Sequence, residues 1–269
     1  MSQPGSLPNA SVAQDVPQTP RRKLNLLDIH PLKLAQQLSL LEHDLCKDVI
    51  ISDLEARRAL SEPRQQDSIS PVIKFSNHLA TWVMQNILEP EDAPGRATVM
   101  EYFISVAHNV LGMNNFSSMT AIIAGLFTPY VYRLNGTWKL VSKEKHNDME
   151  SCRKICKPNN GFVNSFMALA CLEPPGVPFI GFNLMVRDET DAYYDALVLR
   201  GFARWQSTPY SFEVDEDIRA FIQEGLSQFA GSNGDDTDRF KKLSLNREPE
   251  RKGEQEAFRK LLNGLQLEV

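Results

Sequence analysis

Residues 117–128, with the sequence SSMTAIIAGLFT, are apolar or small on nearly every face of a helix. Such a helix needs other elements all around it, because its apolar faces would otherwise stay in contact with water. The longest apolar run, Met119 to Val131, is shorter than the roughly 20 residues that a membrane span needs, and it contains Pro129. The segment therefore predicts a helix at the centre of a soluble bundle.

Four other segments repeat apolar residues at spacings of three and four, which is typical of amphipathic helices. One begins at Pro31, a residue that suits the first turn of a helix because its missing N–H would be unpaired there anyway. The others are 72–88, 96–113 and 215–229. In chain order, the apolar faces of these four segments carry the following residues: Leu34, Leu38, Leu41 and Leu45 after Pro31; Phe75, Leu79, Trp82 and Val83 in 72–88; Met100, Phe103, Ala107 and Leu111 in 96–113; and Ile218, Phe221, Ile222 and Phe229 in 215–229. The chain is expected to be mostly α-helical, with a loop over 56–70.

One segment favours β-structure. Residues 130–141, YVYRLNGTWKLV, place β-favouring side chains on both sides of Asn135-Gly136. Asn-Gly between two such runs is the strongest short-range signal for a β-hairpin. Local pattern alone therefore predicts a hairpin here.

The two ends of the chain differ from the middle. Residues 1–23 contain Pro4, Pro8, Pro17 and Pro20 but no aromatic residue, a composition that predicts a disordered tail. Residues 252–269 are charged, and a short helix is expected over 254–264. The N-terminus has no basic region followed by an apolar one, so we expect a cytoplasmic protein.

Charge and motifs exclude several functions. The net charge is −5 and the basic residues are scattered among acidic ones, which argues against a nucleic-acid partner. Nucleotide-binding glycine loops, metalloprotease helices and the serine-hydrolase elbow are absent from the sequence. Cys152 and Cys156, with His146 upstream, supply too few clustered ligands for a structural zinc and are read as reduced thiols. No metal and no cofactor is expected.

Asn114 and Asn115 allow two interpretations. They can contact a partner, or they can cap the helix that follows, because Asn is favoured at the N-cap and Ser117 and Ser118 can share that role. Spacing alone favours the cap. A helical chain with aromatic anchors but no nucleophile or metal site is typical of an interaction module.

Six segments in order resemble the catalytic domain of Ras-type guanine nucleotide exchange factors, from Leu24 to about Arg251. These segments are HPLKLAQQLSLLEHDLC, SPVIKFSNHLATWVMQNIL, RATVMEYFISVAHNVLGMNNFSSMTAIIAGLFTPYVYRLNGTW, PPGVPFIGFNL, QSTPYSF and LSLNREPE. Each alone is a weak match, but their order makes the resemblance specific. It implies an all-α, irregular helical bowl over residues 24–251, in which RLNGTW lies in a turn between helices rather than in a hairpin.

The resemblance implies a function without covalent chemistry. An exchange factor of this family binds a Ras-family small GTPase, prefers its nucleotide-free state and displaces its switch regions, so that GDP leaves. Carried over, the GTPase-binding residues are Asn114, Asn115 and Phe116 at the partner-facing core, with Ala107 and Phe179 lining a switch pocket. Arg133 and Trp138 are assigned to structure: Arg133 to satisfying carbonyls and Trp138 to filling the core.

The sequence departs from the family after Gly181. The family has a long segment there that forms a projecting hairpin, whereas only 25 residues lie between Gly181 and Ser207. Met185 and Glu189, one helical turn apart, are the candidate catalytic wedge because they offer an apolar tip and a carboxylate on one face.

Three explanations for the short segment stay open: a reduced exchange factor, a missing exon, or a non-catalytic GTPase-binding scaffold. An unrelated helical adaptor is a further hypothesis, but it leaves the ordered motifs unexplained. Whether the domain is an active exchange catalyst, which GTPase it binds, and whether it is recruited to the inner face of a membrane are not decided by the sequence.

Overall fold

The computed structural model describes residues 24–59, 67–156, 173–181, 201–229 and 236–249. Within these ranges the chain forms helices and no β-strand, so the predicted all-α class is confirmed. The named helices are η1 (Leu26–Asp28), α1 (Pro31–Cys46), α2 (Ile51–Ala59), α3 (Ser70–Leu88), α4 (Ala93–Gly112), α5 (Phe116–Leu126), α6 (Pro129–Tyr132), α7 (Asn135–Trp138), α8 (Lys143–Cys156), α12 (Glu216–Ser227) and α13 (Asp236–Arg247).

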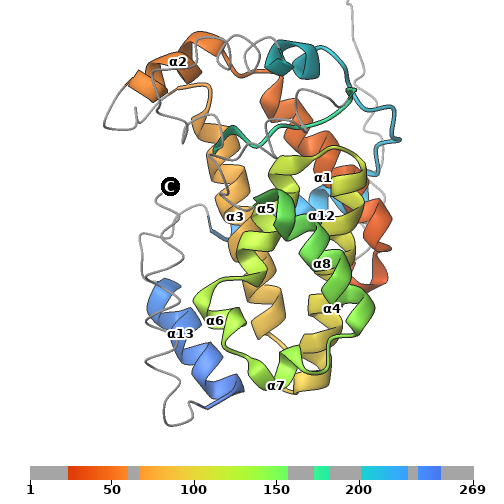
Figure 1. The fold of residues 1–269 in the computed structure, drawn as a ribbon, viewed down its shortest axis with the longest axis vertical. Coiled ribbons are helices and arrows are strands. Elements are labelled where there is room, and N and C mark those ends of the chain that lie inside the picture. The colour runs from red at the N-terminus through yellow and green to blue at the C-terminus, as the bar shows by residue number, and fades with distance from the viewer. Residues whose placement is uncertain (1–23, 60–66, 157–172, 182–200, 230–235, 250–269) are drawn as a thin grey trace, which may run out of the picture.

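Helix α5 lies inside the bundle, as its apolar sequence predicts. It packs against α1, α3, α4, α6 and α8 (Figure 1). Met119, Ile122 and Leu126 have no exposed surface. These five helices therefore form a shell around α5.

The predicted amphipathic helices are confirmed as α1, α3, α4 and α12, with bounds that differ by a few residues. Besides η1, α6 and α7, three described helices are not predicted by pattern. Residues 56–59, expected in a loop, belong to α2. The highly charged helices α8 and α13 have few apolar residues; of α8, only Met149 and Cys152 are buried. A helix that contributes so few side chains to the core leaves a weak periodic signal in its sequence.

The β-hairpin that local pattern predicts over 130–141 is wrong. The segment forms two single-turn helices, α6 and α7, joined through Arg133 and Leu134. Val131 and Leu134 are fully buried, and the indole Nε1 of Trp138 donates to the carbonyl of Val131 over 3.1 Å. Burial of these side chains by neighbouring helices outweighs the local preference for strands. The turn between helices that the family resemblance implies is the better prediction.

The crossing of α3 and α5 depends on Gly125. A Cβ at this position would lie 2.6 Å from the carbonyl oxygen of Ala80 and 2.8 Å from the Cβ of Val83. These contacts are shorter than carbon atoms tolerate, and one of them is with backbone. Only glycine lets the central helix approach α3 this closely.

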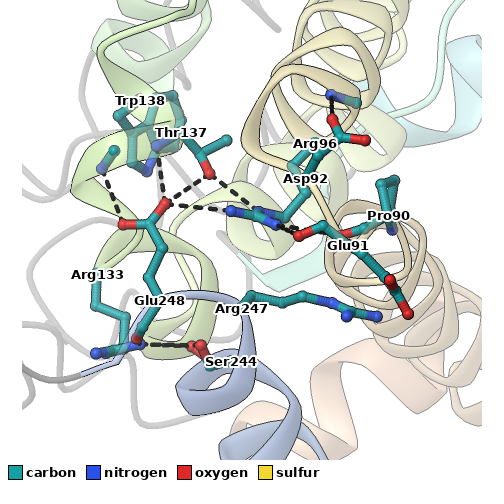
Figure 2. Close-up of polar contacts among 12 residues, drawn as sticks. Pro90, Glu91, Asp92, Arg96, Arg133, Thr137, Trp138, Ser244, Arg247 and Glu248 are labelled. Atoms are coloured by element: carbon teal, nitrogen blue, oxygen red, sulfur yellow. Dashed lines mark hydrogen bonds and ion pairs between the residues drawn. The ribbon is translucent and has the colours of Figure 1, made fainter.

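A polar clasp, consisting of Arg96, Arg133, Thr137, Ser244 and Glu248, joins α4, α6, α7 and α13 (Figure 2). The carboxylate of Glu248 accepts hydrogen bonds from the amide N–H of Gly136 (2.9 Å), and from the amide N–H (2.8 Å) and hydroxyl (2.7 Å) of Thr137. It also lies 3.5 Å from Arg96, whose side chain is 2% exposed. The clasp therefore supplies the anion that this buried guanidinium needs.

Arg133 and Trp138 have the structural roles assigned from the sequence. The Nη1 of Arg133 donates to the carbonyl of Ser244 (3.1 Å) and to that of Glu248 (2.7 Å). The Trp138 ring packs against the core and lies 6.2 Å from the ring of Phe127. Both side chains secure the turn to its neighbours.

The first test concerns the helix crossing. Gly125→Ala is expected to lower the free energy of unfolding by about 1–3 kcal/mol, because the added methyl forces α3 and α5 apart. Urea denaturation measures this loss. Gly112→Ala is the matched control: a Cβ there meets no atom within 4 Å, so its stability should be unchanged or higher. Equal behaviour of the two variants would contradict the close-packing argument.

The second test concerns the clasp. Burial alone would raise the pKa of Glu248, but hydrogen bonds from Thr137 and Gly136 and the charge of Arg96 outweigh it and leave this pKa below the ordinary value of 4.5. The ionised carboxylate therefore stabilises the fold above pH 4.5, and this stability is lost as the pH falls through the depressed pKa.

Glu248→Gln should lower the free energy of unfolding at pH 7 by about 1–3 kcal/mol. The difference from wild type should shrink on acidification below pH 4.5. Denaturation curves at several pH values measure both effects, and a difference that does not depend on pH would argue against an ionised Glu248.

Candidate functional site

The turn between α4 and α5, residues 113–116, is here called the lip. Asn114 adopts a left-handed backbone with φ of 57°, which Asn tolerates better than most side chains do. Its side-chain amide donates to the carbonyls of Glu173 (3.2 Å) and Pro175 (3.3 Å). Asn114 thus ties the lip to residues 173–175, and its side chain stays partly exposed.

Asn115 is the N-cap of α5, so the capping interpretation is confirmed. Its side-chain oxygen accepts from the amide N–H of Ser118 over 2.9 Å, and its amide group donates to the hydroxyl of Ser39 over 3.2 Å. Asn115 has no exposed surface, and Phe116 is 1% exposed and packs near Trp205. These two predicted binding residues lie inside the domain, where they fix the start of α5.

The lip pairs with the PPGVPF segment. The amide N–H of Val177 donates to the carbonyl of Asn114 (3.0 Å), and the amide N–H of Phe116 donates to the carbonyl of Val177 (2.9 Å). These bonds form an isolated parallel bridge between Asn115 and Val177. The structure therefore brings the NNF motif next to the segment that carries Phe179.

Phe179 is half-buried and packs against the edge of the core. Its ring lies over Gly181, where a Cβ would come within 2.4 Å of the ring. This contact gives a physical reason for the Phe-x-Gly pattern. Ala107 is on α4 with no exposed surface. The proposed wedge residues Met185 and Glu189 lie outside the described residues.

The QSTPYSF segment braces the same region from the other side. The side-chain amide of Gln206 donates to the carbonyls of Cys46, the last residue of α1, and Val49, each over 2.8 Å. The hydroxyl of Tyr210 donates to the carbonyl of Met113 over 2.8 Å. Three of the motif segments recognised in the sequence therefore meet at the lip.

Sequence reasoning missed Glu42, which is buried beside the lip with no exposed surface. Its carboxylate accepts hydrogen bonds from the hydroxyls of Ser118 on α5 and Ser76 on α3. The signal was available: Glu42 follows Leu38 by four residues on α1, so it falls on the face that Leu34 and Leu38 predict to be buried. A carboxylate on an apolar face requires a polar partner in the core.

The cysteines and acidic residues of the described ranges do not form a metal site. Cys152 is buried as a free thiol on α8, and Cys156 lies 3.6 Å from the hydroxyl of Thr120. The ring of His146 lies beside that of Trp138. Among the residues that the structure describes, no group of three His, Cys, Asp or Glu side chains could hold a metal ion. Within the same ranges, no helix has the length and apolar character to span a membrane.

Comparison with known proteins agrees with the motifs. The family profile described as RasGEF domain matches residues 33–200. Guanine nucleotide exchange factor SDC25 of Saccharomyces cerevisiae (strain YJM789) is 32% identical over 173 residues, which cover 62% of this chain and 14% of that protein. Cell division control protein 25 of S. cerevisiae (strain ATCC 204508 / S288c) is 33% identical over 172 residues, or 61% of this chain and 10% of that protein.

Protein son of sevenless of Drosophila melanogaster is 27% identical over 232 residues, which cover 79% of this chain and 14% of that protein. The chain thus spans only a small part of the length of these relatives. The profile covers most of the chain and contains the lip, its paired segment and Glu42. The chain therefore belongs to the family defined by the RasGEF domain.

Proposed function

We propose that residues 24–251 form a guanine nucleotide exchange domain for a Ras-family small GTPase, with residues 1–23 and 252–269 as tails. The observation that supports this best is the convergence of three family motifs at the lip, where Asn114 and Val177 share a backbone hydrogen bond. Names of the relatives point to the same activity: SDC25 is a guanine nucleotide exchange factor.

In this proposal the domain acts by differential binding. A surface that binds the GTPase more tightly without nucleotide than with it must weaken nucleotide binding by the same factor. Among the predicted residues that the structure describes, Asn114 and Phe179 are partly exposed, so we assign the contact with the GTPase to them. Asn115, Phe116 and Ala107, which are buried, would hold that surface in shape.

A second candidate is a GTPase-binding scaffold without exchange activity. It is favoured by the short stretch between Gly181 and Ser207, where the family has a projecting hairpin. This candidate predicts a complex with a nucleotide-free GTPase but no faster release of GDP.

Release of a fluorescent GDP analogue from Ras, Rap and Ral proteins separates the two candidates. We expect the domain to accelerate release from one of them, with EDTA as the positive control. Binding of a nucleotide-free GTPase without acceleration on any would favour the scaffold. Neither binding nor acceleration would contradict both proposals.

Two variants test the assigned surface. Asn114→Gly removes the amide but keeps the left-handed backbone accessible, and Phe179→Ala removes the ring. Each should weaken binding of a nucleotide-free GTPase about tenfold or more, as loss of an interface anchor does. Glu144→Gln, at an exposed position on α8, is the control and should bind as wild type does. Unchanged binding by both test variants would show that the surface lies elsewhere.

A further inference from the structure

We propose that Glu42 is a positioning residue for nucleotide exchange: its buried carboxylate anchors the start of α5 and thereby holds the lip in its binding shape. This inference rests on the proposed function and adds a residue to it. Glu42 itself has no exposed surface, so it acts through the lip and makes no contact with the GTPase.

The carboxylate of Glu42 joins three helices. Oε2 of Glu42, on α1, accepts from the hydroxyl of Ser118 on α5, and Oε1 accepts from the hydroxyl of Ser76 on α3 over 3.4 Å. The hydroxyl of Ser76 lies a further 3.2 Å from that of Ser117. Ser117 and Ser118 are buried in the first turn of α5. The carboxylate therefore lies at the positive end of the helix dipole, which favours its ionised form.

Ser118 and Asn115 connect this anchor to the lip. Ser118 also donates its backbone N–H to Asn115, whose amide group donates to Ser39. Ser39 and Glu42 lie three residues apart on α1, so one face of α1 holds both the cap and the first turn of α5. The hydroxyl of Ser39 in turn lies 3.8 Å from the sulfur of Met113. The left-handed turn at Asn114 is thus enclosed between two anchored residues.

Burial of the Glu42 carboxylate costs stability. Burial raises the pKa of Glu42, and hydrogen bonds from Ser117, Ser118, Asn115 and Ser76 only partly offset the effect. Two titratable groups feel its charge: Cys46 on α1 and Tyr210, whose pKa values are raised first by burial and then by Glu42. His43, next to it on α1, packs its ring against Tyr210. The elements α3 and α5 face it with hydroxyl and amide groups.

Because the pKa is raised in the folded state, the ionised form of Glu42 disfavours folding. This cost grows as the pH rises from the ordinary value of 4.5 through the raised pKa. A neutral side chain of the same shape should remove the cost. Glu42→Gln is therefore expected to unfold at about the same temperature as wild type at pH 7, because the loss of one hydrogen bond offsets this gain. The substitution would leave one of the two serine hydroxyls without its acceptor, and it would remove the ionisable group at the start of α5.

The test compares Glu42→Gln with Glu248→Gln, in the distant clasp, in the full chain. For Glu42→Gln we expect exchange on the responsive GTPase to fall about tenfold or more, since small displacements of a positioned group have effects of that size. Hydrogen–deuterium exchange should speed up in peptides that contain Phe116 and Val177 but not in α8. Glu248→Gln should show the opposite pattern, with a lower unfolding temperature and unchanged exchange activity.

The outcomes separate this inference from the proposed function. The inference is wrong if Glu42→Gln changes neither the nucleotide exchange activity nor the protection of the lip amides from hydrogen–deuterium exchange. It is also wrong if activity and protection fall only as far as a lower unfolding temperature explains. If wild type accelerates GDP release from no GTPase, the proposed function fails. Hydrogen–deuterium exchange of the lip in Glu42→Gln then still decides whether Glu42 positions the lip. If Glu42→Gln does not fold, Ser118→Ala, which removes one donor only, decides by the same measurements.

Discussion

The structure depends on the burial of α5. A helix that is apolar on all sides gains stability only when other helices surround it. Its first turn is then buried, and the backbone N–H groups of that turn have no partner within the helix. Those groups cannot reach water, so neighbouring groups must satisfy them. The side chain of Asn115 accepts from the N–H of Ser118, and the carbonyl of Val177 accepts from those of Phe116 and Ser117. The polar cluster beside the lip is thus a direct consequence of placing this helix at the centre.

Two polar clusters hold the bundle, and they differ in their energetics. At the clasp, a carboxylate with a depressed pKa neutralises a buried arginine, so the ionised pair supports folding. At the lip, a carboxylate with a raised pKa has hydroxyl and amide groups as its partners among the described residues. Strongly perturbed pKa values are found preferentially at functional sites. This contrast is why the two clusters make suitable controls for each other.

The sequence allowed the fold to be predicted where burial left a periodic pattern. Leu34 and Leu38 on α1 are fully buried as expected, and the family motifs corrected the hairpin expected around Asn135-Gly136. Helix α8 was missed because it buries few side chains. At the site, the Asn115 cap followed from local rules, whereas Glu42 was overlooked. Its role depends on Ser76 and Ser118, and their proximity arises only from tertiary packing.

The clasp also constrains the order of events during synthesis. Arg96 and Glu248 are separated by 152 positions in the chain, so the ribosome releases the arginine long before its anion exists. Until then the guanidinium is more stable in water than in the core, which opposes closure of α4 against α7. Native contacts that span such distances form late. We therefore expect α4 and α7 to stay apart in the nascent chain until Glu248, which follows α13, has left the ribosome.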